Sequence, residues 1–124
     1  MAPRAELPAR PDLSHEGHLW RRRARFVAGL DEAGRGAWAG PVVAAAVVLP
    51  PDRDDLIDLL HGVRDSKVMT RRQRETWATR ICELSLAVGV GETPADQVDA
   101  IGLMAATRAA MRAALAALSL TPDH

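Results

Sequence analysis

Two acidic residues followed by a glycine-framed arginine are the part of this chain best suited to chemistry. Asp31 and Glu32 come at the end of a short apolar run, and Gly34, Arg35 and Gly36 follow at once. Carboxylates at the mouth of a buried strand are costly to desolvate unless a cation or hydrogen-bond donors offset them. Their hard oxygen atoms suit Mg²⁺ or Mn²⁺. The pattern predicts a metal beside a phosphate-bearing ligand. The other interpretation is an acidic pair that caps a hairpin loop, and spacing alone divides the two about evenly.

Positive charge for a phosphate is available from Arg35 and Lys67. Two flanking glycines let the backbone approach a ligand closely, and the Arg35 fork suits phosphate oxygens. A lone Gly-x-Gly is weak evidence, and the spacing after it excludes a Walker or Rossmann loop. Lys67 is the only lysine beside fifteen arginines. An ordinary surface lysine is the other interpretation, and the arginine bias shifts the balance modestly toward a phosphate contact. Asp31 and Glu32 can share one cation only if the strand bends or ends there, because adjacent strand residues point to opposite faces.

Composition indicates one domain preceded by a tail. The chain has 124 residues, about half of them apolar, and no net charge, so polyanion binding would rest on local patches. Residues 1–24 are proline-rich without apolar periodicity and are predicted to be a disordered N-terminal tail. The arginines at 21–23 could touch phosphates, although a solvated flank is the commoner case. A single cysteine, Cys82, fits a reducing cytoplasm, and no apolar run approaches the roughly 18 residues of a membrane span.

The order of apolar runs and breakers over residues 25–124 predicts an α/β or α+β layer fold. Strands are expected at 26–30, 42–49 and 86–90, the first two antiparallel because they lie too close for a crossover helix. Helices are expected at 52–60, after an N-cap at Thr70, and over 99–118 after Thr93-Pro94. The last helix is expected to bury Met104, Met111, Leu115 and Leu118, with a weak spot at Gly102.

Three segments together resemble ribonuclease HII, the type 2 ribonuclease H. They are VAGLDEAGRG with the following AGPVVAAAVVLP, then RDSKVMTRRQRE, and then LAVGVGETPADQVDAIGLMAATRAAMRAALAAL. The resemblance covers residues 25–124, in order and with compatible spacing. It implies an α/β, ribonuclease H-like mixed sheet with flanking helices, truncated here before the fourth strand.

The resemblance also implies a function. The family is a metal-dependent endonuclease that uses Mn²⁺ or Mg²⁺ to hydrolyse the RNA strand of RNA–DNA hybrids, including single ribonucleotides embedded in DNA. The implied partner is that nucleic acid in the cytoplasm, without a membrane or an obligate protein partner. By position, the resemblance assigns metal binding and catalysis to Asp31 and Glu32, reading of the ribose 2′-hydroxyl to Gly34, Arg35 and Gly36, and a backbone contact to Lys67.

One departure from the family pattern leaves an alternative open. The family's next strand carries a third metal-binding aspartate, and the sequence stops at His124, about where that strand would begin. The fourth aspartate and a substrate-site tyrosine are also absent. The alternative is therefore a catalytically inactive fragment or a residual nucleic-acid-binding module. A strand missing beside residues 26–30 would leave an open sheet edge there. An unrelated metal-binding α/β domain is the remaining possibility.

Overall fold

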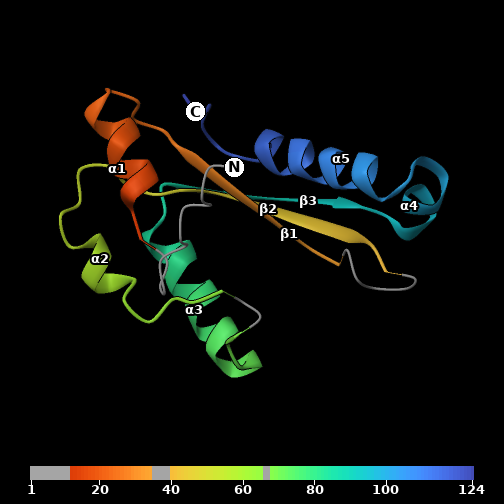
Figure 1. Ribbon diagram of the computed structural model, residues 1–124, viewed down its shortest axis with the longest axis horizontal. Coiled ribbons are helices and arrows are strands. Elements are labelled where there is room, and N and C mark those ends of the chain that lie inside the picture. Colours follow the sequence, from red (N-terminus) through yellow and green to blue (C-terminus); the bar gives the residue numbers. More distant parts are fainter. Residues whose placement is uncertain (1–11, 35–39, 66–67) are drawn as a thin grey trace, which may run out of the picture.

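A three-stranded antiparallel sheet carries the acidic pair. The computed structural model describes residues 12–34, 40–65 and 68–124. The strand order is β1-β2-β3, with each neighbouring pair antiparallel (Figure 1). The predicted α/β fold with three antiparallel strands is confirmed. The elements in chain order are α1 (Ser14–Arg21), β1 (Ala28–Ala33), β2 (Val42–Val48), α2 (Leu56–Leu59), α3 (Arg71–Leu84), β3 (Ala87–Thr93), α4 (Ala95–Ile101) and α5 (Leu103–Ala116).

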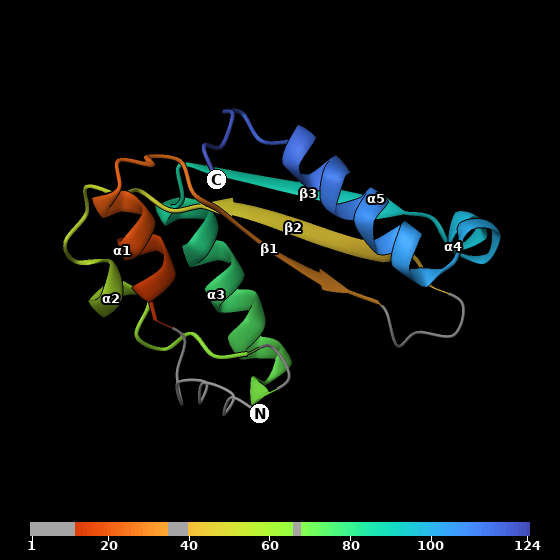
Figure 2. The same ribbon diagram turned by 45° about the horizontal axis from the view of Figure 1, so that its top comes forward.

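Helices cover the two faces of the sheet unequally. The long helix α5 packs along β3 and β2 on one face, and α1, α2 and α3 gather at the end of the sheet where β1 begins (Figure 2). The far end of β1, which carries the acidic pair, therefore lies away from α1–α3. Among the described residues, no helix is long and apolar enough to cross a membrane.

Small side chains form the core between the sheet and α5. Alternate residues of β2 are fully buried from Val42 to Val48, and they face Ala106, Ala110 and Ala114 of α5. A Cβ atom added at Gly91 would lie 2.2 Å from the Ala110 carbonyl oxygen. The glycines of β3 and the alanines of α5 thus let the helix lie directly on the strand backbone.

The last predicted helix is divided in two and buries a different set of residues. Gly102 has a φ of 87° and separates α4 from α5. The predicted core position of Met104 is wrong, because its side chain is 68% exposed. Alanines spaced by four residues are the most deeply buried side chains of α5, and Met111 and Leu115 pack at their margin. Periodicity read from the large side chains therefore located the helix but misplaced part of its buried stripe.

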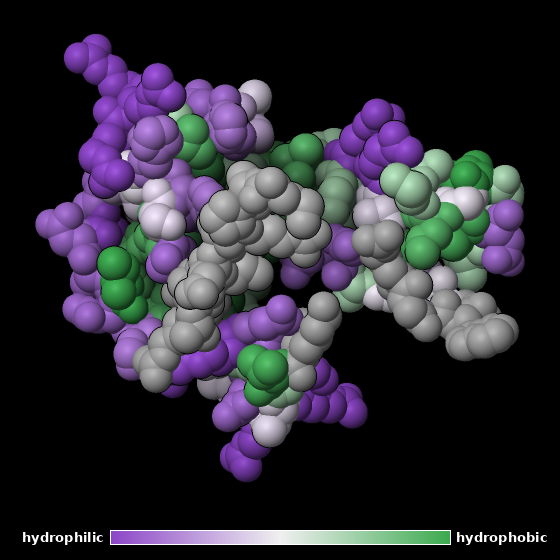
Figure 3. Space-filling view, viewed as in Figure 1, coloured by the Kyte–Doolittle hydropathy of each residue, from purple (hydrophilic) through white to green (hydrophobic). Residues whose placement is uncertain are grey.

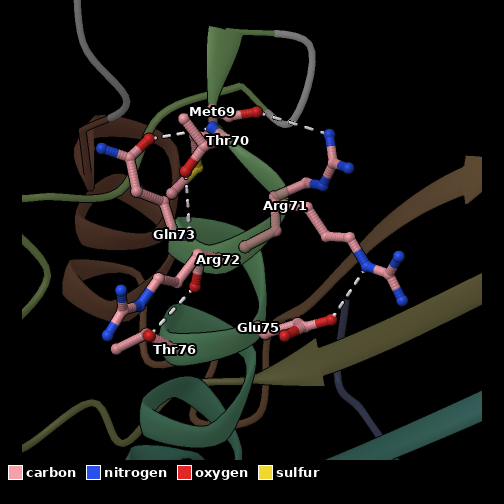
Figure 4. Close-up of polar contacts among 8 residues, drawn as sticks. Met69, Thr70, Arg71, Arg72, Gln73, Glu75 and Thr76 are labelled. Atoms are coloured by element: carbon pink, nitrogen blue, oxygen red, sulfur yellow. Dashed lines mark hydrogen bonds and ion pairs between the residues drawn. The ribbon is translucent and has the colours of Figure 1, made fainter.

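Of the two helix starts predicted at threonines, the structure confirms the one at Thr70 but not the one at Thr93. Thr70 caps α3 as predicted: its hydroxyl accepts from the Gln73 N–H at 3.1 Å, and its own N–H donates to the Gln73 side chain at 2.9 Å (Figure 4). Thr93 does not cap α4. It is the buried last residue of β3, and its hydroxyl donates to the Ala106 carbonyl at 2.7 Å, which ties the strand to α5.

The segment before β1 contains a helix where the sequence predicts a disordered tail. Within residues 1–24, α1 spans Ser14–Arg21, and residues 1–11 lie outside the described part. An Asp12 carboxylate accepts from the Ser14 N–H at 3.0 Å at the start of this helix. The last proline of this segment is Pro11, so residues 12–24 contain no proline that would prevent a helix.

The end of the chain returns to the start of β1. The Ala28 N–H donates to the His124 carbonyl at 2.9 Å, and the N–H groups of Asp123 and His124 both donate to the Phe26 carbonyl. His124 therefore donates to Phe26 and accepts from Ala28, the two residues that flank Val27. This is the hydrogen-bond pattern of a parallel β-bridge between Val27 and His124. The edge expected to be open over residues 26–30 is therefore bonded at Phe26 and Ala28.

Candidate metal site at the edge of the sheet

The acidic pair lies inside β1 rather than at its end. Asp31 pairs with Ala45 and Glu32 with Ala44, and β1 continues through Ala33. The sequence-based expectation that the strand ends at the pair is therefore wrong. The regular pairing with β2 carries the strand past both carboxylates.

The two side chains consequently point to opposite faces of the sheet. Residues paired directly across antiparallel strands point to the same face. Glu32 therefore shares the α5 face with the buried Ala44 and is itself partly buried. Asp31 is exposed on the other face, in the row that ends at Val90, which is 60% exposed. One carboxylate thus borders the covered face and the other borders the open face.

Side chains on opposite faces of β1 come closest to one another beside the edge of β1 that faces away from β2. Among the described strands, β1 has β2 as its only neighbour, so its other edge is where the two faces meet. The Asp31 Oδ1 atom accepts from the Glu32 backbone N–H at 2.9 Å. This bond directs the Asp31 carboxylate along the strand toward its neighbour.

The donor set fits a hard divalent cation but supplies only part of its shell. In the described part of the chain, no group of three or more His, Cys, Asp or Glu residues could hold a metal ion. Mg²⁺ is commonly held by one or two carboxylates, with waters and substrate phosphates completing an octahedron. Asp31 and Glu32 match that mode of binding.

Gly34, two residues after the pair, lies against the backbone of Pro41. Gly34 has a φ of 92°, and a Cβ atom added to it would lie 2.3 Å from the Pro41 carbonyl oxygen. Glycine is therefore required there by both backbone conformation and space. The structure places Asp31 and Glu32 inside β1 and Gly34 directly after it, whereas Arg35, Gly36 and Lys67 lie outside the described residues.

Comparison with known proteins identifies the family. Residues 28–124 match the family model described as ribonuclease HII. The chain belongs to the ribonuclease HII family. It is 55% identical over 113 residues to a ribonuclease HII from Chloroflexus aurantiacus, covering 91% of this chain and 53% of that one. It is 51% identical over 106 residues to one from a Synechococcus species, covering 86% and 47%.

A solved structure supports the same ribonuclease HII assignment. The crystal structure of ribonuclease H2 from Pyrococcus horikoshii aligns with a TM-score of 0.61 at 30% identity, covering 78% of this chain and 46% of that one. The predicted family and the ribonuclease H-like fold are confirmed. The chain spans about half the length of the curated ribonuclease HII relatives it matches.

Asp123, near the end of the chain, has a clear structural role. The Asp123 carboxylate accepts from the backbone N–H groups of Phe26 at 2.8 Å and Arg25 at 2.9 Å. These two hydrogen bonds, with the nearby Arg25 charge, lower the pKa of Asp123 below its ordinary value. No local sequence pattern predicts this contact, because the two donors lie 97 and 98 residues away from Asp123 in the chain.

Proposed function

We propose that this chain carries metal-binding carboxylates of an endonuclease that hydrolyses the RNA strand of RNA–DNA hybrids, including single ribonucleotides embedded in DNA. The observation that carries the proposal is the placement of Asp31 and Glu32, one toward each face, on the edge strand β1. Membership of the ribonuclease HII family supports it.

Each site residue has a proposed task. A bound Mg²⁺ or Mn²⁺ would activate the attacking water and stabilise the leaving oxygen. Asp31 and Glu32 would hold the cation from the two faces. The turn that begins at Gly34 would present backbone donors and Arg35 to the ribose 2′-hydroxyl, the group that distinguishes RNA from DNA. Gly36 would allow close backbone approach there, and Lys67 would contact a backbone phosphate.

A second candidate function is nucleic-acid binding without catalysis. It is favoured by one observation: within the described residues, the acidic pair has no third carboxylate, histidine or cysteine grouped with it for metal binding. Both candidates share a polyanionic ligand and the cytoplasmic location that the single Cys82 led us to expect. They differ in whether a phosphodiester bond is broken.

Cleavage and binding measured side by side separate the two candidates. The substrate is a labelled DNA duplex with one embedded ribonucleotide, incubated with the chain in Mn²⁺, in Mg²⁺ and in EDTA. We expect metal-dependent cleavage that leaves a 3′-hydroxyl and a 5′-phosphate and is lost in Asp31→Asn and Glu32→Gln. Glu92→Gln is the matched control, because Glu92 is an exposed carboxylate of the same sheet on β3. Binding without cleavage in either metal would reject the nuclease and leave the binding module.

A further inference from the structure

A positively charged cleft lies at the opposite end of β1 from the acidic pair. It has a volume of about 590 Å³ and separates the end of α1 from the turn after β2. Hydrophilic side chains cover the α1 end of the molecule (Figure 3). The residues that matter for its chemistry are Trp20, Arg21, Arg23, Arg25, Pro51 and Asp52.

The charge of this cleft favours an anion. Its lining has three guanidinium groups against one carboxylate, Asp52. Asp52 pairs with Arg25 at 3.2 Å, and the side chains are 83% and 69% exposed, so the pair is readily exchanged for another partner. The lining residues therefore leave two positive charges in excess, on Arg21 and Arg23, and the Asp123 carboxylate beside Arg25 offsets part of this charge. The guanidinium fork matches phosphate oxygens in a bidentate manner.

Arg23 occupies a backbone position that normally belongs to glycine. Its φ is 71°, the only positive value at a non-glycine residue in the described chain. The Ala24 N–H donates to the Leu19 carbonyl at 3.1 Å and the Arg23 N–H to the Trp20 carbonyl at 3.0 Å, which is the Schellman ending of a helix. Glycine fits the left-handed residue of that motif without strain, whereas a side chain there costs free energy. The backbone thus gains nothing from arginine at this position, and its side chain is exposed at the cleft.

A further polar group in the lining lacks a partner. The indole Nε1 of Trp20 is buried and has no hydrogen-bond acceptor among the described residues. Buried donors are normally satisfied. The Trp20 side chain therefore carries an unmet hydrogen-bond donor at this end of the molecule.

We propose that this cleft binds backbone phosphates of the nucleic-acid duplex, away from the metal site. The identity of the ligand rests on the proposed function, whereas the charge and backbone geometry do not. Arg25 is six residues before Asp31, a span of at most about 20 Å at the rise of a strand. Phosphates repeat at about 3.4 Å along one strand of a duplex. A duplex that reaches Asp31 can therefore reach the cleft about six nucleotides away.

The test measures binding in EDTA, so that it does not depend on catalysis. The probes are a labelled RNA–DNA hybrid and a DNA duplex of equal length, followed by fluorescence anisotropy over a series of salt concentrations. Arg23→Gly removes the cation and relieves the backbone. Arg22→Gln removes the same charge from the same turn, but Arg22 does not line the cleft.

We expect Arg23→Gly to weaken binding of both probes at least fivefold and to reduce the salt slope by about one. Its melting temperature should stay equal or rise, and Arg22→Gln should change binding by less than twofold. Equal effects of the two variants, or no binding of either probe by the unmodified chain, would overturn the inference. Normal binding without cleavage would reject the proposed nuclease activity while leaving this site intact.

Discussion

The carboxylate of Asp31 accepts a 2.9 Å hydrogen bond from the backbone N–H of Glu32. The two residues are neighbours in a regular strand, so their side chains leave on opposite faces. The bond draws the Asp31 carboxylate along the strand, toward the backbone of Glu32.

Replacing Gly34 with alanine should destabilise the fold. The new Cβ would lie 2.3 Å from the Pro41 carbonyl, on a backbone with positive φ, and we expect a loss of about 1–3 kcal/mol in unfolding free energy. Urea denaturation measures it. Gly102→Ala is the matched control, because its φ is also positive but nothing lies within 4 Å of the new Cβ. A Gly34 variant no less stable than the Gly102 variant would show that Gly34 is not held against Pro41.

Replacing Gly91 with alanine should separate α5 from β3. The added methyl would lie 2.2 Å from the Ala110 carbonyl, a backbone atom that cannot move without shifting the helix. We expect overpacking to lower the free energy of unfolding by about 1–3 kcal/mol, which thermal or urea unfolding measures. Gly29→Ala should cost well under half of that, since the nearest atom to its new Cβ is 4.0 Å away. Equal stability of both variants would contradict the close packing of α5.

The contact of Asp123 with the start of β1 should make stability depend on pH. Its hydrogen bonds to the Phe26 and Arg25 N–H groups lower the folded-state pKa below the ordinary 3.8. A lowered carboxyl pKa contributes stability above the unfolded-state value, and that contribution is lost as the pH falls through the folded-state value. We therefore expect Asp123→Asn to melt below the unmodified chain at pH 7.

The difference in melting temperature between these two proteins should shrink as the pH is lowered past 3.8. Asp12 and Asp55 also have lowered pKa values, from hydrogen bonds with Ser14 and Arg53 respectively, but they are present in both proteins and cancel in the comparison. A difference that is constant from pH 7 to pH 3 would show that the Asp123 charge does not stabilise the fold.

Features encoded by neighbouring residues were predictable from the sequence. The cap at Thr70 was found because its partner is three residues away, and β2 was found as an unbroken apolar run. Contacts between distant segments were not. The Thr93 hydroxyl donates to the Ala106 carbonyl of α5 and does not cap α4, the helix that follows Thr93. Residue spacing near Thr93 could not predict that hydrogen bond.

The buried face of α5 was predicted from its large apolar side chains, and this placed part of the face incorrectly. Large apolar residues suggested a stripe that includes Met104, whereas close packing on Gly91 selects alanines. For the site, the acidic pair and the glycine turn were predictable as a pattern. Their arrangement about a sheet edge was not, because it depends on the register between β1 and β2.

The most direct test of the edge site is a Mn²⁺ titration followed by electron paramagnetic resonance, in which bound Mn²⁺ leaves the free-ion signal. We predict that the unmodified chain and Glu92→Gln bind Mn²⁺ with the same affinity. Asp31→Asn and Glu32→Gln should each weaken Mn²⁺ binding by at least about tenfold. Mutating a residue that only hydrogen-bonds to a metal ligand typically lowers metal affinity by that much, and a ligand itself should contribute no less. Equal Mn²⁺ affinity in all four proteins would contradict a cation held jointly by Asp31 and Glu32.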